Sequence, residues 1–225
     1  LGDVYKRQVG GTVYYYLFAP QFHPSKTVYV YIDRDDTTDS IYNKIRQNGH
    51  VNQFTGFLWM AKYKKLNQNI HTGRYAIRPN DNVYHVFSRL SRGYQEPINL
   101  TIGSVRTLDR LARSVGKQLM IDSAEIARHL FDSTFQAEMG YTPITMACLF
   151  IPETYQVYWD MSADEFFKRM QTEHQRFWND ERLARATAIG MTPEEVCTLA
   201  SIVEEETNNN EAVSYTHLRA HETGR

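Results

Sequence analysis

Residues 73–93 read GRYAIRPNDNVYHVFSRLSRG and place a strand pattern directly before a helix pattern. The segment Gly73–Ile77 predicts a short strand. Asn80 and Asp81 are the predicted N-terminal cap of the helix that follows. Apolar side chains then recur at the i, i+3, i+4 and i+7 positions of one helix face, namely Val83, Val86, Phe87 and Leu90. Gly93 is expected to end this helix, so the stretch favours a mixed α+β fold.

The flanking segments continue the alternation of short strands and helices. Residues 27–33 and 97–102 are β-branched or apolar and predict two more strands. Residues 41–48, behind an acidic cap cluster at 35–39, predict a helix that Gly49 ends, and residues 52–63 predict another. Together these elements predict a small α+β module over residues 27–102.

The remainder of the chain, residues 103–212, is predicted to be mainly helical. Thr107–Gly116, Ser123–Phe131 and Ser162–Trp178 carry amphipathic helix patterns. The apolar run 144–158, interrupted by Pro152, is expected to lie deep in the protein. Thr192 as cap and Pro193 at the first helical position predict the start of a last helix.

Composition excludes several classes of protein. Of the 225 residues 42% are apolar and 23% charged, which is ordinary for a globular protein and unlike a disordered chain, a fibrous repeat or a polytopic membrane protein. Twenty-five basic and 26 acidic side chains give a net charge of −1, so nucleic acid is not an expected partner. The fifteen tyrosines can pack in a hydrophobic core and can offer ring surfaces on which sugars stack.

No metal or cofactor is expected. Two cysteines, Cys148 and Cys197, are too few for a disulfide scaffold or a four-thiolate site. Each lies in an apolar run, which favours the interpretation of a small buried hydrophobic residue. The eight histidines show no metal-ligand spacing.

Both ends of the chain are predicted to be foreign to the fold. Residues 1–8 and 213–225 resemble translated sequencing-adapter read-through, and we expect the chain to be a fragment of a longer protein. Residues 9–20, with three consecutive tyrosines before a polar segment, predict the end of an N-terminal transmembrane anchor. The alternative for this segment is an apolar strand of the core.

The helix expected over residues 193–207 carries the candidate chemistry. On a helical wheel Val196, Leu199, Ile202 and Val203 form an apolar stripe that also contains Glu206, whereas Glu204 and Glu205 lie outside it. A carboxylate at the end of an apolar face is partly desolvated, which raises its pKa and suits it to general acid catalysis. The alternative is a frayed acidic helix end with all three glutamates in water.

Three segments resemble the MltG (YceG-like) endolytic murein transglycosylases. They are residues 199–207 (LASIVEEET), 72–79 (TGRYAIRP) with the helix that follows, and 149–155 (LFIPETY). They occur in the family's order, from the apolar N-terminal segment to about residue 211. Two departures stand out: Ala147-Cys148 occupies the place of the family's Glu-Gly, and Glu153 replaces an aspartate.

The resemblance implies a LysM-like subdomain at 27–102 and the N-terminal part of a transglycosylase catalytic domain at 103–212. It implies a lyase that cleaves MurNAc–GlcNAc bonds of nascent peptidoglycan and leaves 1,6-anhydromuramic ends. Glu206, with Glu204 as the alternative, would act as acid and then as base, without a cofactor.

By the same resemblance the protein would be a single-pass protein of the bacterial inner membrane facing the periplasm, with peptidoglycan strands and peptidoglycan synthases as partners. The fragment by itself is expected to be inactive. Two other functions stay open: a non-catalytic, membrane-anchored LysM-like glycan-binding module, and a membrane-anchored scaffold for protein contacts.

Overall fold

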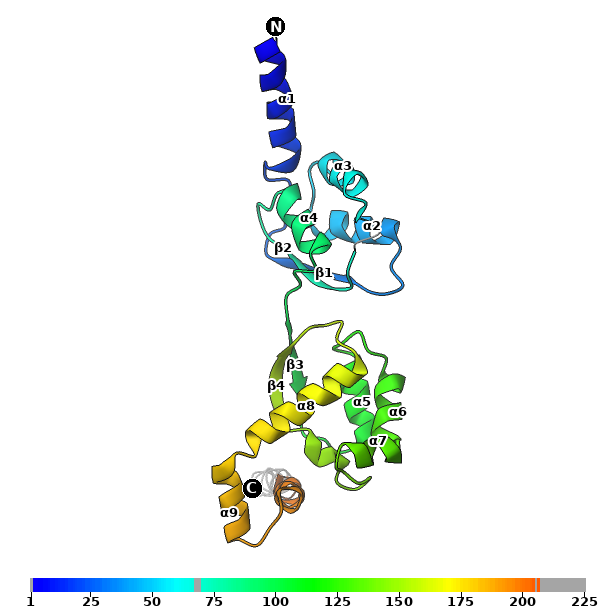
Figure 1. The fold of residues 1–225 in the computed structure, drawn as a ribbon, viewed down its shortest axis with the longest axis vertical. Helices are drawn as coiled ribbons and strands as arrows, with labels where there is room; N and C mark the ends of the chain where they lie inside the picture. Colours follow the sequence, from blue (N-terminus) through cyan, green and yellow to red (C-terminus); the bar gives the residue numbers. More distant parts are fainter. Residues whose placement is uncertain (1, 67–69, 205, 207–225) are drawn as a thin grey trace, which may run out of the picture. The chain divides into compact units, whose positions relative to one another are not determined.

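The structure, a computed structural model, describes residues 2–66, 70–204 and 206. The chain divides into two compact units (Figure 1). The first comprises the residues up to Leu100 together with Tyr155–Met161, and the second comprises Thr101–Thr154 with the residues from Ser162 onward. Helices and two small two-stranded sheets make up the described chain, which confirms the predicted α+β, mainly helical fold.

The first unit is built around one antiparallel strand pair. Its elements are α1 (Gly2–Leu17), β1 (Val28–Ile32), α2 (Thr38–Asn48), α3 (Thr55–Tyr63), β2 (Gly73–Ile77) and α4 (Val83–Ser91). β1 pairs with β2 so that Val28 is opposite Ile77 and Ile32 is opposite Gly73. Two helices therefore separate paired strands in the sequence, and α4 follows the second strand.

The core of this unit confirms the periodicity of residues 73–93. The four side chains predicted for one face of α4 are all buried. They pack with aliphatic and aromatic side chains of β1, β2, α2 and α3, including Val30, Ile32, Ile41, Ile45, Phe57, Tyr75 and Ile77. Burial of this apolar surface, at about 25 cal/mol per Å², is the main stabilising contribution.

The cap of α4 differs from the predicted one. Asn82, not Asn80 or Asp81, is the N-cap, and its side chain accepts a hydrogen bond from the backbone N–H of His85 at 2.8 Å. Asp81 instead accepts from the backbone N–H of Arg78 at 2.7 Å and forms an ion pair with Arg89. Because Arg78 and Arg89 already engage the Asp81 carboxylate, the next residue, Asn82, caps the helix.

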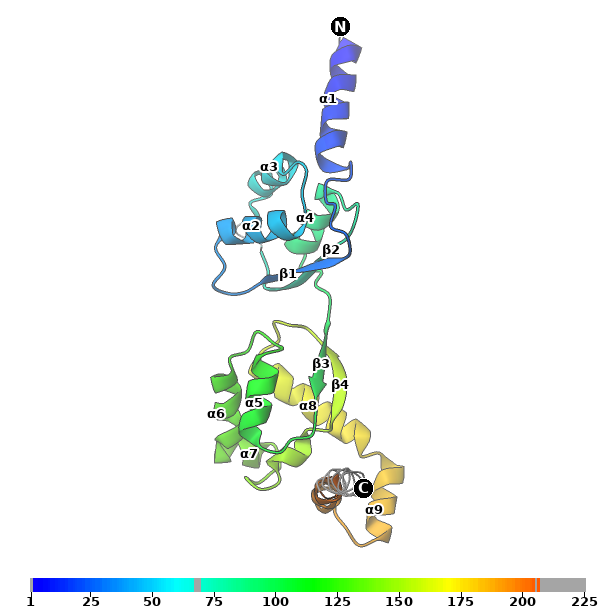
Figure 2. The ribbon, with the colours of Figure 1, turned by 180° about the vertical axis from the view of Figure 1, so that it is seen from behind.

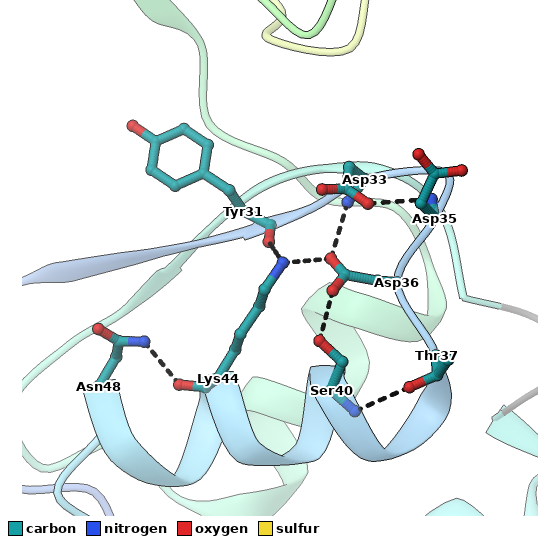
Figure 3. A network of polar contacts seen from close by, with 8 residues as sticks. All are labelled: Tyr31, Asp33, Asp35, Asp36, Thr37, Ser40, Lys44 and Asn48. Carbon is teal, nitrogen blue, oxygen red and sulfur yellow. Dashed lines mark hydrogen bonds and ion pairs between the residues drawn. The ribbon is translucent and has the colours of Figure 1, made fainter.

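The acidic cluster before α2 forms a polar network (Figure 3). The buried carboxylate of Asp36 accepts from Lys44, from the Ser40 hydroxyl at 2.6 Å and from the backbone N–H of Asp33 at 3.0 Å. Burial by itself would raise the pKa of Asp36, but these hydrogen bonds outweigh it and lower the pKa. Thr37 caps the helix through Ser40, so the loop and the first turn of α2 form one connected unit.

Residues 9–17, predicted as an anchor end or as a core strand, belong to α1. The core-strand alternative is wrong, because the segment is helical and Val9, Tyr14 and Tyr15 are exposed. Residues 2–8, predicted to be foreign, continue the same helix. Among the described residues no helix is both long enough and apolar enough to cross a membrane.

The second unit is mainly helical. Its elements are α5 (Leu108–Gly116), α6 (Ser123–Phe131), α7 (Ser133–Glu138), the 3-10 helix η2 (Met146–Leu149), α8 (Ala163–Phe177), α9 (Asp180–Ala188) and a helix over 193–204. The strands β3 (Ile98–Ile102) and β4 (Glu153–Val157) pair with each other (Figure 2). The predicted helices at 107–116, 123–131 and 162–178 are confirmed, whereas α7 and α9 were not predicted.

The apolar run 144–158 does not lie deep throughout. Met146, Leu149 and Phe150 are buried, and Phe150 stacks on Phe166 of α8. Ile144, however, is 91% exposed. The reason is a surface turn in which Thr142 and Thr145 exchange side chain-to-backbone hydrogen bonds at 2.9 and 3.2 Å, which turns Ile144 outward.

Candidate functional site

A large groove lies in the second unit and collects most of the predicted site residues. It has a volume of about 1130 Å³. Five segments line it: the loop after β3, η2 with the residues that follow it, the end of α8, α9, and the helix over 193–204. Both Glu204 and Glu206 lie on its wall.

The helix over 193–204 begins as the sequence predicts. The Thr192 hydroxyl accepts from the backbone N–H of Glu195 at 3.3 Å, and the Glu195 carboxylate accepts from the backbone N–H of Thr192 at 2.8 Å. This reciprocal pair is a capping box, which satisfies two backbone donors at the helix start. It fixes the residue at which the helix begins and therefore the position of the glutamates in its last turn. Thr207, the expected last residue, lies outside the described residues.

The expected desolvation of Glu206 is not present in the structure. Glu206 is exposed, and so are the apolar side chains of its own face: Leu199 is 45% exposed, Ile202 54% and Val203 55%. The wheel placed Glu206 on an apolar stripe, but within the described residues that stripe faces solvent. An amphipathic pattern shows which residues share a face and leaves open what covers that face.

Glu204 makes a specific contact that the sequence did not suggest. The Ser104 hydroxyl, in the loop after β3, lies 2.6 Å from Oε1 and 2.7 Å from Oε2 of Glu204 and donates to this carboxylate. The hydroxyl orients the carboxylate toward the loop. Ser104 was missed because a single serine after a strand carries no sequence signal.

Cationic and aromatic side chains of α8 and α9 also line the groove. Arg182 of α9 stacks its guanidinium 4.1 Å from the ring centroid of Phe177 and donates to the Phe177 carbonyl at 2.6 Å. Arg185 pairs with Glu181 at 2.6 Å. Trp178, which lines the groove, has no hydrogen-bond partner for its Nε1 among the described residues. The wall thus combines flat apolar surfaces with positive charge, the combination that suits an acidic carbohydrate.

The two cysteines lie on the same groove, in contact with each other. Both are half-buried, so the expectation of small buried hydrophobic residues is wrong. A hydrogen bond from the Cys197 thiol, aided by the Thr198 hydroxyl, lowers the pKa of Cys148 to about 7, although burial opposes this shift. The same contact and burial raise the pKa of Cys197.

The other two family-like segments support the scaffold. The Tyr75 hydroxyl donates to the backbone carbonyls of His71 at 3.0 Å and Thr72 at 3.2 Å, and burial raises its pKa to about 12. Glu153 is exposed on β4, and its neighbour Thr154 bonds Thr101 across the sheet at 3.1 Å. In the part of the chain that the structure describes, no three His, Cys, Asp or Glu side chains are grouped to hold a metal ion.

Fold and groove together define a two-unit α+β protein with neighbouring helix-borne carboxylates facing an aromatic, cationic wall. The model of the YceG-like family matches residues 30–215, and the chain belongs to this family. A crystal structure of the yceG-like protein lmo1499 from Listeria monocytogenes is similar, with 21% identity and a TM-score of 0.48 over 81% of this chain. This chain covers 65% of that protein's chain. No curated protein matches the sequence significantly.

Proposed function

We propose that the chain is part of an endolytic lytic transglycosylase that cleaves MurNAc–GlcNAc bonds of peptidoglycan. Membership of the YceG-like family supports a peptidoglycan substrate and this class of lyase. The observation that carries the proposal is the position of Glu204 and Glu206 on one groove with aromatic and arginine side chains. At about 1130 Å³ the groove exceeds the roughly 300–1,000 Å³ usual for small-molecule sites, as an extended polymer requires.

In the proposed reaction Glu206 acts twice. As an acid it protonates the glycosidic oxygen while the C1–O bond breaks, and GlcNAc leaves with a free 4-hydroxyl. As a carboxylate it then takes the proton from the C6 hydroxyl of the muramic acid, whose oxygen attacks C1 and closes the 1,6-anhydro ring. Water is not consumed, so a second carboxylate to place a nucleophile is not needed.

The surrounding residues have distinct proposed roles. Ser104 holds Glu204, whereas Glu206 has no such hydroxyl contact among the described residues. Arg182 and Arg185 would bind lactyl or peptide carboxylates of the substrate, because guanidinium groups pair well with carboxylates. Phe177, beside Arg182 on the groove wall, offers a ring for sugar stacking. The proposal places the protein at the periplasmic face of the bacterial inner membrane, anchored through a segment that includes residues 9–17 of α1, with peptidoglycan synthases as partners.

A second candidate function rests on the first unit, whose strand–helix–helix–strand order is LysM-like. Tyr31 of β1, 41% exposed, packs edge-on against Trp159 at 5.0 Å between ring centroids, and Tyr158 beside it is 54% exposed. Such exposed rings suit non-catalytic glycan binding.

One experiment separates the two candidates. Purified sacculi are incubated with the full-length protein and with its Glu206→Gln and Glu204→Gln variants, and 1,6-anhydromuramic ends are counted by mass spectrometry. If the full-length protein releases 1,6-anhydromuramic ends and either substitution abolishes this release, the result supports the enzyme proposal. Undiminished sacculus binding by all three proteins with no anhydro product would establish the binding module instead.

A further inference from the structure

The two cysteines of the chain come from segments that are distant in the sequence. Cys148 belongs to η2 and Cys197 to the helix over 193–204, and both line the groove. The Sγ of Cys148 lies 3.8 Å from the backbone carbonyl of Glu194, one turn before Cys197 on the same helix. Each thiol also shifts the pKa of the other, as neighbouring sulfurs do. Cys148 therefore lies against the turn of the helix that leads to Cys197.

We propose that Cys148 and Cys197 form a thiol–disulfide modification site, at which a small-molecule or protein disulfide oxidises the pair to an intramolecular bond. A disulfide needs its two Cβ atoms about 3.5–4.5 Å apart, and the Cys148 Sγ already lies 3.8 Å from a backbone atom of the turn that precedes Cys197. Both side chains are half-buried and lie on a groove wall, which gives an oxidant access to them.

The proposed step is a two-electron exchange between thiols and a disulfide. The Cys148 thiolate attacks one sulfur of the oxidant R–S–S–R, so that a mixed disulfide forms and RS⁻ leaves. The Cys197 thiol loses its proton and attacks the Cys148 sulfur, and the second RS⁻ leaves. The two cysteine sulfurs are oxidised, the oxidant is reduced to two thiols, and these take up the two protons.

The surroundings favour Cys148 as the attacking thiol. Hydrogen bonds from Cys197 and Thr198 stabilise its thiolate, and a pKa of about 7 leaves much of it ionised at neutral pH. Two other titratable groups, Glu194 and Tyr141, interact with the pair, and His174 lies behind them in contact with Tyr141. The Glu194 charge opposes ionisation of the thiols, whereas burial keeps Tyr141, whose pKa is raised to about 12, neutral.

The bond would change the groove. It would join η2 covalently to the helix that carries Glu204. The bond would fix the middle of this helix to the η2 side of the groove, at Cys197, four residues before Ser201. The proposal concerns thiol chemistry alone and holds whether or not the protein cleaves glycans.

The test uses the reduced 225-residue chain, treated with oxidised glutathione at neutral pH. We expect both titratable thiols to disappear, the monomer to lose the mass of two hydrogen atoms, and proteolysis to yield one peptide pair linked through Cys148 and Cys197. Dithiothreitol should restore both thiols. The oxidised chain should also unfold at a higher temperature than the reduced one, because the cross-link restricts the unfolded chain.

Cys148→Ser and Cys197→Ser are the matched controls. Each should stop at a single mixed disulfide with glutathione. Cys197→Ser should react about tenfold faster than Cys148→Ser, because the serine hydroxyl can donate to the Cys148 thiolate in place of the Cys197 thiol. The proposal is overturned if the native chain keeps both thiols, carries two glutathiones without a linked peptide, or forms only intermolecular dimers. Equal reaction rates for the two variants would overturn the assignment of Cys148 as the attacking thiol.

Discussion

Ser104 and Glu204 lie 100 residues apart in the sequence, and the hydroxyl of the first is 2.6 Å from Oε1 of the second. The contact ties the loop after β3 to the end of the helix over 193–204. It also distinguishes two motif glutamates that the family resemblance leaves equivalent, because only Glu204 has this hydroxyl contact among the described side chains. The first two predictions follow from this difference.

Glu206→Gln in the full-length protein should retain glycan binding and lower turnover by roughly 10²–10⁴, the usual loss for a general acid–base residue. The amide has the same shape but neither releases nor accepts the proton that the reaction moves. The measurement is the initial rate of 1,6-anhydromuramic end formation. Glu204→Gln is the matched control and should cost much less; the reverse order would transfer the role to Glu204.

Ser104→Ala should act through Glu204 alone. A hydrogen bond between exposed groups contributes about 0.2–1 kcal/mol, so the substitution should lower the free energy of unfolding by no more than this. In a double-mutant cycle with Glu204→Gln, measured by urea unfolding of the 225-residue chain, the two losses should be non-additive. Strict additivity would mean that the contact makes no energetic contribution in solution.

Arg182→Ala should weaken binding of peptidoglycan strands by about tenfold, or 1.4 kcal/mol, because it removes a cation and a stacked surface from the groove wall. Binding is measured by sedimentation with purified sacculi. Arg176→Ala is the control, since Arg176 lies on α8, pairs with Glu173 and does not line the groove. Equal losses for both variants would indicate a general charge effect.

The 225-residue chain alone should release no anhydromuropeptides. Glu206 and its apolar neighbours are open to solvent, so a glycosidic bond placed there would not be desolvated. The measurement is a long incubation with sacculi followed by mass spectrometry. If the 225-residue chain forms product and Glu206→Gln abolishes it, an exposed carboxylate is sufficient for the reaction.

Asp36→Asn should destabilise the first unit by about 1–3 kcal/mol at pH 7, because the buried carboxylate accepts several hydrogen bonds, one of them from a lysine. The pKa of Asp36 is lowered from 3.8 by folding, so its contribution is present above about pH 4 and is lost as the pH falls through the lower, folded-state value. Calorimetric melts should show the native–variant difference shrinking toward pH 3. The exposed Asp35→Asn should change little, and a pH-independent difference would contradict the assignment.

Local patterns were sufficient for most of the elements. The short segment 73–77 and the stripe of Val83, Val86, Phe87 and Leu90 predict β2 and α4, and both the strand and the burial are observed. The capping box at Thr192 and Glu195 was foreseeable for the same reason, since it joins residues three positions apart. Such features depend on neighbours along the chain, so the sequence contains them directly.

Tertiary structure decided everything that depends on distant partners. The wheel assigned Glu206 to an apolar face, but only the fold shows that this face is exposed. Ser104 reaches Glu204, and Cys148 reaches Cys197, because β3 and η2 are packed beside the last described helix. The sequence by itself determined the family, most of the elements and the candidate glutamates. Burial and long-range contacts were settled by folding, because they depend on which surfaces of separate elements meet.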